Sequence, residues 1–309
     1  PPRSTLFPYT TLFRSGGLRQ GAVYEGLAEA TLDLDLARLA GWRGARVQVS
    51  GIHAHGESPS AELVGDMQSV SNIDSFRDEA MLYELWLEQS LWEGVLALRG
   101  GLVAADTEVV VTGPGSVFLN SAFGWPSGIS LNTENTGPAF FRPALGGQVR
   151  WRPRDGWTVH AGVYDGDTFD GDPEGDSALA FRWGSEDGTF GMLEVAREWD
   201  DGEGLERGRV RVGCWGHSLE VPEHGDEGEW GRRAGLYGGV ETFVWRDEVR
   251  ADRALALFGR VAWSPAERSV AEWSGDAGMG LLGLLAERYE DVLGVGVAWV
   301  KISEDCRGK

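Results

Sequence analysis

The stretch from Leu82 to Leu102, LYELWLEQSLWEGVLALRGGL, constrains the fold more than any other part of the chain. Two runs of alternating apolar and polar residues flank the turn-like segment Leu91–Gly94, and this pattern predicts a β-hairpin. The apolar face carries Tyr83, Leu85, Leu87, Leu96, Leu98 and Leu102, and the polar face carries Glu84, Trp86, Glu88 and Arg99. A soluble sandwich would bury the apolar face against a second sheet, whereas a membrane barrel would turn it toward lipid.

Charge and hydropathy exclude several classes of protein. The 309 residues include 48 acidic and 28 basic side chains, which give a net charge of -20. A surface of this sign repels a phosphate backbone, so nucleic acid is excluded as a partner. No apolar run reaches the roughly 18 to 20 residues of a membrane helix, but barrel strands need only about 9 to 11 alternating residues. The two cysteines, Cys214 and Cys306, provide no disulfide framework.

The alternation recurs along the chain and predicts about twelve strands joined alternately by short and long connections. They are expected at Val23–Leu36, where a helix is the rival interpretation, and at Arg46–Ser50, Leu82–Gln89, Leu96–Leu102, Leu145–Arg152, Trp157–Tyr164, Phe190–Trp199, Arg209–His217, Leu236–Trp245, Leu255–Trp263, Met279–Leu285 and Val292–Val300. Tryptophans stand near strand ends, as in the interfacial girdles of barrels: Trp151, Trp157, Trp199, Trp245, Trp263 and Trp299. The pattern favours an all-β, antiparallel transmembrane β-barrel.

The two ends of the chain differ from what lies between them. Residues 1–15, PPRSTLFPYTTLFRS, lack the features of a signal peptide and look like a translated sequencing adapter. The other end, Lys301–Lys309, is polar and has no terminal aromatic residue. We therefore expect a non-native segment at 1–15 and a partial barrel domain at 16–309, incomplete at the C-terminus.

Several short motifs, in this order and spacing, resemble the carbohydrate-selective outer-membrane porins of the OprB type. They are GDMQSVSNI at 65–73, LYELWLEQ at 82–89, LALRGGL at 96–102, FLNSAFG at 118–124, RVGCWGHS at 211–218, GLYGGVE at 235–241, LFGRVAWSP at 257–265, Ala277-Gly278 and Asp291–Gly296. The resemblance extends from about residue 20 to 301. It implies a barrel of sixteen strands in the bacterial outer membrane that passes sugars by diffusion and that contacts lipid. A homo-oligomer remains open.

A sugar pore needs hydrogen-bonding and aromatic side chains along its lumen. The predicted lumen-facing set consists of Arg46, Glu84, Trp86, Glu88, Arg99, Arg150, Arg152, Arg211, Trp215, Tyr237, Glu241 and Arg260. Arg99 and Glu84 are expected at the narrowest part, because they lie on paired strands. The long segment Asp106–Arg142 is expected either to fold inward as a constriction or to cover the outside of the pore.

No cofactor is expected, and the sequence offers little for catalysis. The five histidines are scattered and no nucleophile motif accompanies them. A weak calcium hypothesis rests on Asp165, Asp167, Asp170 and Asp172, but the EF-hand pattern is not met. Glu84 and Glu88 share a strand face, so a glycoside hydrolase is the main rival to a porin. A soluble or secreted β-rich carbohydrate-binding protein is the other rival.

Overall fold

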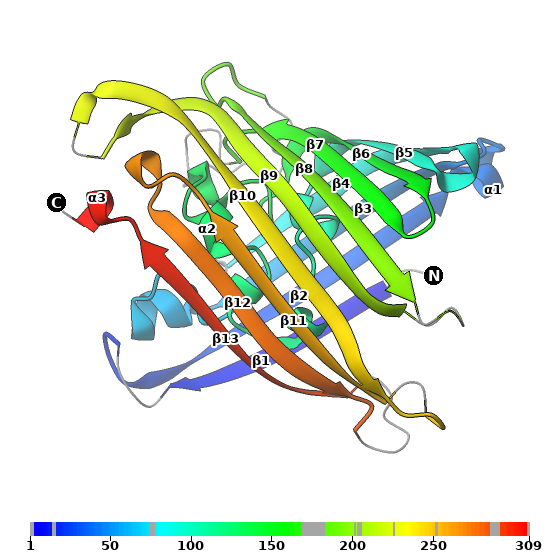
Figure 1. Cartoon of the computed structure of the whole chain (residues 1–309), viewed down its shortest axis with the longest axis horizontal. Helices are drawn as coiled ribbons and strands as arrows, with labels where there is room; N and C mark the ends of the chain where they lie inside the picture. The colour runs from blue at the N-terminus through cyan, green and yellow to red at the C-terminus, as the bar shows by residue number, and fades with distance from the viewer. Residues whose placement is uncertain are drawn as a thin grey trace.

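The computed structural model describes residues 3–13, 17–74, 78–168, 183–200, 202, 206–224, 226–250, 253–284 and 291–307. Thirteen antiparallel strands form one sheet, in which each strand pairs with its neighbours in sequence. They are β1 (Arg3–Phe13), β2 (Gly21–Asp35), β3 (Ala45–Gly56), β4 (Glu79–Leu91), β5 (Leu96–Val103), β6 (Ala144–Arg154), β7 (Trp157–Asp165), β8 (Thr189–Asp200), β9 (Glu206–Glu223), β10 (Asp226–Arg246), β11 (Ala254–Trp263), β12 (Ala271–Leu282) and β13 (Val292–Ile302). The sheet curls into a barrel wall of tilted strands (Figure 1).

The helices are short and belong to the connections. They are α1 (Leu36–Ala40), α2 (Ser127–Ser130) and α3 (Glu304–Arg307). Single turns occur at Ser60–Val64, Trp92–Gly94, Ala105–Thr107, Pro114–Val117, Ser121–Phe123, Glu134–Thr136 and Ala266–Arg268. The Asp35 side chain caps α1 by accepting a hydrogen bond from the Ala37 amide at 2.9 Å. Among the described residues, no helix is long and apolar enough to cross a bilayer.

All twelve predicted strands are confirmed, as β2 to β13, and the helical alternative for Val23–Leu36 is wrong. The predicted turn after β4 is also confirmed, with left-handed backbone at Trp92, Glu93 and Gly94. One further strand, β1, pairs with β2 and lies within the predicted non-native segment, whose origin stays a prediction. In the described part of the chain, no ladder joins β1 to β13.

The outer face of the curled sheet is apolar and exposed. Leu87 and Leu98, in the hairpin that β4 and β5 form, are 37% and 43% exposed, and Val295 on β13 is 71% exposed. The tryptophans Trp151, Trp245, Trp263 and Trp299 are exposed, and Trp157 and Trp199 are half-buried. Within the described residues there is no second sheet to cover this face. The sandwich alternative is therefore wrong.

Tyr83 corrects one part of the predicted outer face. Ser50 on β3 pairs with Glu84, but the next residue, Gly51, pairs with Leu82, so Tyr83 forms a bulge. A bulge places two consecutive side chains on the same side of a strand. Tyr83 and Glu84 are accordingly both buried, and Tyr83 packs edge-on against Phe140 with 5.5 Å between ring centroids. Tyr83 belongs to the interior and not to the lipid-facing surface.

Candidate pore constriction

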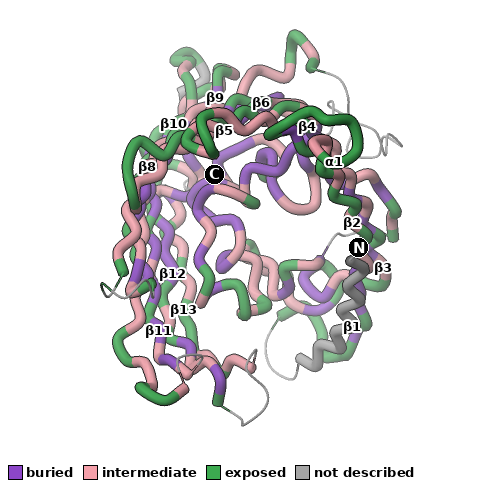
Figure 2. Tube along the Cα trace, turned by 90° about the vertical axis from the view of Figure 1, so that its right-hand side faces the viewer, coloured by how far each residue is buried: buried purple, intermediate pink, exposed green. Residues whose placement is uncertain are grey.

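The connection between β5 and β6, residues 104–143, includes α2, which lies on the inner side of the curled sheet (Figure 1). Buried parts of the chain occupy the space that the sheet encloses (Figure 2). The connection crosses to the opposite wall, where three of its amide groups donate to wall side chains. The amide of Val110 donates to Glu194 on β8 at 2.9 Å, that of Gly113 to Glu241 on β10 at 3.0 Å, and that of Gly128 to Ser274 on β12 at 2.8 Å. Of the two expectations for Asp106–Arg142, the inward fold is therefore the one observed.

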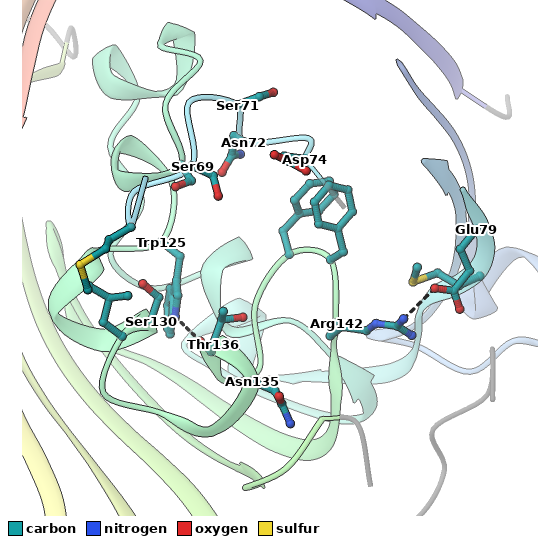
Figure 3. Close-up of a pocket in the computed structure, with 16 residues that line it drawn as sticks. Ser69, Ser71, Asn72, Asp74, Glu79, Trp125, Ser130, Asn135, Thr136 and Arg142 are labelled. Atoms are coloured by element: carbon teal, nitrogen blue, oxygen red, sulfur yellow. Dashed lines mark hydrogen bonds and ion pairs between the residues drawn. The ribbon is translucent and has the colours of Figure 1, made fainter. Parts of the chain in front are cut away.

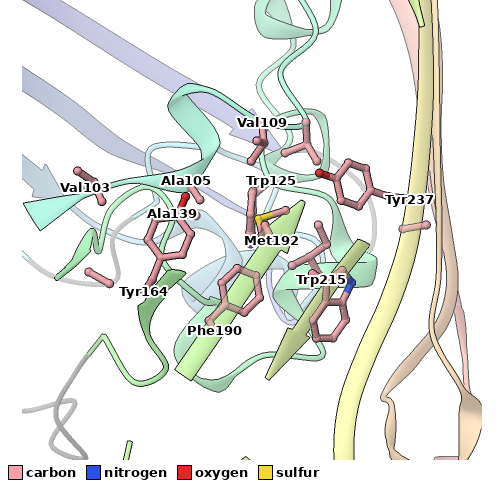
Figure 4. Close-up of a cluster of buried hydrophobic side chains, with 14 of the residues drawn as sticks. Val103, Ala105, Val109, Trp125, Ala139, Tyr164, Phe190, Met192, Trp215 and Tyr237 are labelled. Carbon is pink, nitrogen blue, oxygen red and sulfur yellow. The ribbon is translucent and has the colours of Figure 1, made fainter. Parts of the chain in front are cut away.

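A buried cluster fixes this connection, which we call the constriction loop, against the wall. Its apolar residues pack on inward-facing aromatic residues of β4, β7, β8, β9 and β10 (Figure 4). The cluster consists of Trp86, Val103, Ala105, Val109, Val110, Trp125, Ile129, Ala139, Ala144, Tyr164, Phe190, Met192, Trp215, Tyr237 and Ala262. Burial of this apolar surface favours the folded-in position of the loop.

The described part of the connection between β3 and β4 lies against the constriction loop at residues 68–72. Ser121 donates its amide to the Ser69 carbonyl at 2.9 Å, and Asn72 donates its amide to the Leu119 carbonyl at 2.6 Å. The Asn120 side chain adds a bond to the Gln68 carbonyl at 2.8 Å. Two of the motifs that carry the family resemblance, at 65–73 and 118–124, therefore bind each other inside the barrel.

A cavity of about 440 Å³ opens between these two connections (Figure 3). Its lining combines aromatic and polar side chains. The rings of Phe140 and Phe141 have centroids 3.8 Å apart, and the Trp125 indole donates to the Thr136 carbonyl at 2.8 Å. The full lining is Met67, Ser69, Ser71, Asn72, Asp74, Glu79, Met81, Ser121, Trp125, Ser130, Leu131, Asn135, Thr136, Phe140, Phe141 and Arg142.

An ion pair closes one side of this cavity. Arg142, at the end of the constriction loop, lies 2.7 Å from Glu79 at the start of β4 (Figure 3). Both side chains are about four-fifths buried, with 16% and 20% exposure. Charged donors and acceptors next to aromatic rings suit a solute that has hydroxyl groups on its edge and apolar C–H groups on its faces.

The twelve predicted lumen residues occupy other positions, and the cavity lining does not include them. Glu84, Glu241 and Arg260 bind the backbone of the constriction loop. Trp86, Trp215 and Tyr237 belong to the buried cluster, while Arg46 pairs with Asp33, Arg211 pairs with Glu241, and Arg152 is exposed. Contact of these twelve residues with sugar stays a prediction.

Arg99, Glu88 and Arg150 form a network that also includes the constriction loop. Arg99 lies 2.8 Å from Glu88 and 2.6 Å from Glu108, and its guanidinium stacks over Trp86 at 4.1 Å. Arg150 reaches both carboxylates. Burial raises the pKa of Glu108, but the charges of Arg99 and Arg150 outweigh burial and hold the pKa below its ordinary value. Glu108 is therefore an ionised anchor of the loop.

The paired carboxylates behind the hydrolase alternative have structural partners. Glu84 accepts hydrogen bonds from the Ala104 amide at 3.2 Å and from Gln48 at 2.9 Å. Glu88 is held by Arg99 and Arg150. The two carboxylates are 4% and 6% exposed and do not line the cavity. Both carboxylates therefore serve as attachment points, Glu84 for the loop backbone and Glu88 for two arginines.

The calcium hypothesis falls partly outside the described residues, because Asp170 and Asp172 are not among them. Asp167 accepts a hydrogen bond from Asn135 at 2.7 Å, and Asp165 is buried. In the described ranges, no group of three or more histidine, cysteine or acidic side chains is placed to hold a metal ion.

Comparison with known proteins identifies the chain. Residues 19–308 match the carbohydrate-selective porin family, OprB family. The chain belongs to this family. It is a sugar porin, and its family and fold indicate a channel rather than an enzyme.

Two solved structures of Pseudomonas putida OprB share the fold of this porin. The high-pH structure matches with a TM-score of 0.83 at 18% identity, over 99% of this chain and 76% of the other. The low-pH structure matches with a TM-score of 0.53 at 14% identity, over 90% and 71%. A search of curated proteins found no match.

Asp106 makes the hold on the porin's constriction loop depend on pH. Its carboxylate accepts a hydrogen bond from the Phe140 amide at 3.0 Å, and burial raises its pKa from 3.8 to about 6. The folded state therefore binds this proton more tightly than the unfolded chain does. The protonated Asp106 carboxyl therefore contributes to the free energy of unfolding at low pH, and this contribution is lost as pH rises from about 4 to above 6. The loss is at most about 3 kcal/mol.

Asp106→Asn keeps an acceptor for the Phe140 amide and removes the charge. We expect the variant to be more stable than the wild type at pH 7.5 and equally stable at pH 4, because only the ionised carboxylate carries the burial cost. Urea midpoints of the refolded barrel between pH 4 and 8 measure the difference. Parallel curves for the two proteins would contradict the assignment.

Gly294 and Gly296 on β13 make room for two aromatic residues of the constriction loop. A Cβ atom at Gly296 would lie 2.9 Å from the Phe123 ring and 3.2 Å from the Phe118 ring. These two rings stack with centroids 4.6 Å apart. The inner face of β13 is thus shaped for the loop.

Gly296→Val should displace these rings, because overpacking a fitted contact costs about 1–3 kcal/mol. We expect a lower urea midpoint and a noisier open-channel current. Gly100→Ala serves as the control, since a Cβ atom there would meet its nearest neighbour at 3.9 Å. Equal midpoints for both variants would show that the loop does not rest on Gly296.

Proposed function

We propose that the cavity between the two inward connections is the sugar-selecting constriction of a passive outer-membrane pore. The observation that carries this proposal is the composition of the cavity, in which Phe140, Phe141 and Trp125 stand beside the Arg142–Glu79 pair and several amide and hydroxyl side chains. A pyranose ring presents apolar C–H faces to the aromatic residues and hydroxyl groups to the polar ones. Weak contacts of both kinds slow a sugar without trapping it.

The proposal also states what contacts the outer face of the sheet and which solutes pass through the pore. The exposed leucine, valine and tryptophan side chains of the outer face contact outer-membrane lipid. The permeating solutes are monosaccharides and small oligosaccharides, which cross by diffusion without covalent chemistry or a cofactor. The porin works as a monomer or as a homo-oligomer in which each subunit has its own pore.

Planar-bilayer recording tests the proposal. A refolded, closed barrel that contains this chain should conduct ions, and added glucose or a maltose oligosaccharide should reduce the current in a saturable way. Sorbitol, which has the hydroxyl groups without the ring, should reduce it less, because it lacks a flat apolar face. Absence of channels, equal block by both solutes, or measurable sugar hydrolysis would reject the proposed function.

A further inference from the structure

Arg260 on β11 holds the constriction loop with every donor that a guanidinium offers. Its Nε donates to Asp276, which lies directly opposite on β12, with 3.1 Å to each carboxylate oxygen. Its Nη1 donates to the carbonyls of Val110 and Gly124 at 2.7 and 2.9 Å. Its Nη2 donates to the carbonyls of Ala122 and Phe123 at 2.9 and 2.7 Å. The five N–H groups of arginine are thereby matched by five partners.

These contacts lie directly beside the cavity. Ser121 and Trp125 line the cavity, and the three residues between them, 122 to 124, turn their carbonyls toward Arg260. Val110 brings in a second part of the loop, on the other side of Pro114–Val117. Arg260 and Asp276 are 8% and 5% exposed, so water cannot easily replace these bonds.

We propose that Arg260 is a positioning residue that fixes Trp125 and thereby sets the aperture and the sugar affinity of the constriction. The inference rests on the proposed function of the cavity. It assigns to Arg260 a role through the loop backbone, in place of direct sugar contact. A lysine cannot substitute, because a single ammonium has three donors and no planar fork.

Single-channel recording of Arg260→Met and Arg260→Lys tests the proposal. We expect conductance to rise about twofold or more, and the half-blocking glucose concentration to rise about fivefold or more, because Trp125 loses its fixed position. Arg197→Met is the matched control. Arg197 also donates to backbone carbonyls, those of Asp155 and Glu198, but at the turn between β6 and β7. Wild-type values in both Arg260 variants would overturn the inference.

A disulfide separates positioning from general damage to the barrel. A Cβ atom at Gly128 would lie 3.6 Å from the Ser274 Cβ, within the range of disulfide geometry, and 2.8 Å from the Ala262 Cβ, so Ala262→Gly accompanies the cysteine pair. With Cys214 and Cys306 replaced by serine, Gly128→Cys and Ser274→Cys should lock the loop to β12. In the Arg260→Lys background, the oxidised form should recover wild-type conductance and glucose block, and reduction should abolish the recovery.

The outcomes are distinguishable. If the wild type conducts but is not blocked by sugar, the proposed function of the cavity is rejected. The conductance of the Arg260 variants still tests whether Arg260 sets the aperture. A wild-type chain that is blocked by glucose, with variants that behave identically, rejects only the role of Arg260. If Arg260→Met fails to form a heat-resistant barrel, the locked Arg260→Lys protein decides. If conductance rises when the disulfide of this protein is reduced, the inference is supported. If conductance stays the same after reduction, the inference is overturned.

Discussion

Removal of the constriction loop should turn this selective pore into a wide and unselective one. Replacing residues 107–136 by a four-residue Gly-Ser linker is geometrically feasible, because the Ala105 amide donates to the Pro138 carbonyl at 2.7 Å and the two ends of the loop already meet. We expect single-channel conductance to rise about threefold or more and sugar block to weaken strongly, since the deleted segment lies inside the lumen and carries Trp125 and five other residues of the cavity lining. Conductance and half-blocking glucose concentration are the measurements.

The deletion should also lower the stability of the barrel, because Phe190 and Trp215 would lose their cover and face water. A matched control replaces α1, Leu36–Ala40, which has no buried residue and lies in a turn outside the cavity. The control should conduct and bind sugar like the wild type. If the loop-deleted protein retained normal glucose block, the constriction would have to lie elsewhere.

Removal of the two stacked rings should abolish most of the sugar affinity while leaving the pore open. Phe140→Ala with Phe141→Ala removes two aromatic contacts, each worth about 0.5–1.5 kcal/mol. We expect the half-blocking glucose concentration to rise roughly tenfold or more. Ion conductance should change less, because Arg142, Glu79 and the loop backbone remain. Titration of glucose against the open-channel current measures the effect.

Phe243→Ala is the control for the double variant, because Phe243 lies on β10 near Arg246 and does not line the cavity. It should leave the glucose titration unchanged. Phe140 also packs against Tyr83, so the urea midpoint of the double variant should be measured alongside. A stable double variant with wild-type glucose block would exclude the rings from sugar recognition.

The strands could be predicted from the sequence because their signal is local. Alternation with a period of two marks each strand without reference to any other part of the chain. Thus the faces of Leu293, Val295 and Val297 on β13 were predictable, and they are 61%, 71% and 61% exposed. The inward direction of Tyr83 could not be predicted in this way. It results from a bulge, which depends on the pairing of β4 with Ser50 and Gly51 and cannot be recognised from the sequence of β4 alone.

The cavity could not be predicted in the same way. Its lining comes mainly from two irregular connections, and their partners lie far apart in sequence: Asn72 binds Leu119, and Arg142 binds Glu79. Only two features of the sequence indicated that these connections are important. They are the length of Asp106–Arg142 and the motifs at 65–73 and 118–124. The motifs indicated a family without indicating that they contact each other.

The opening hairpin, β4 and β5, shows where the division falls. Alternation along the two strands is enough to place Leu87 and Leu98 on one face and Glu88 and Arg99 on the other, because side-chain direction alternates along a strand. The contacts of the inward charges depend on the path of the constriction loop. Glu84 and Arg99 meet the constriction loop rather than open water. A polar inner face can line a water-filled lumen or bind an inward-folded loop. Which of the two occurs depends on the path of the loop, and contacts with distant strands set that path.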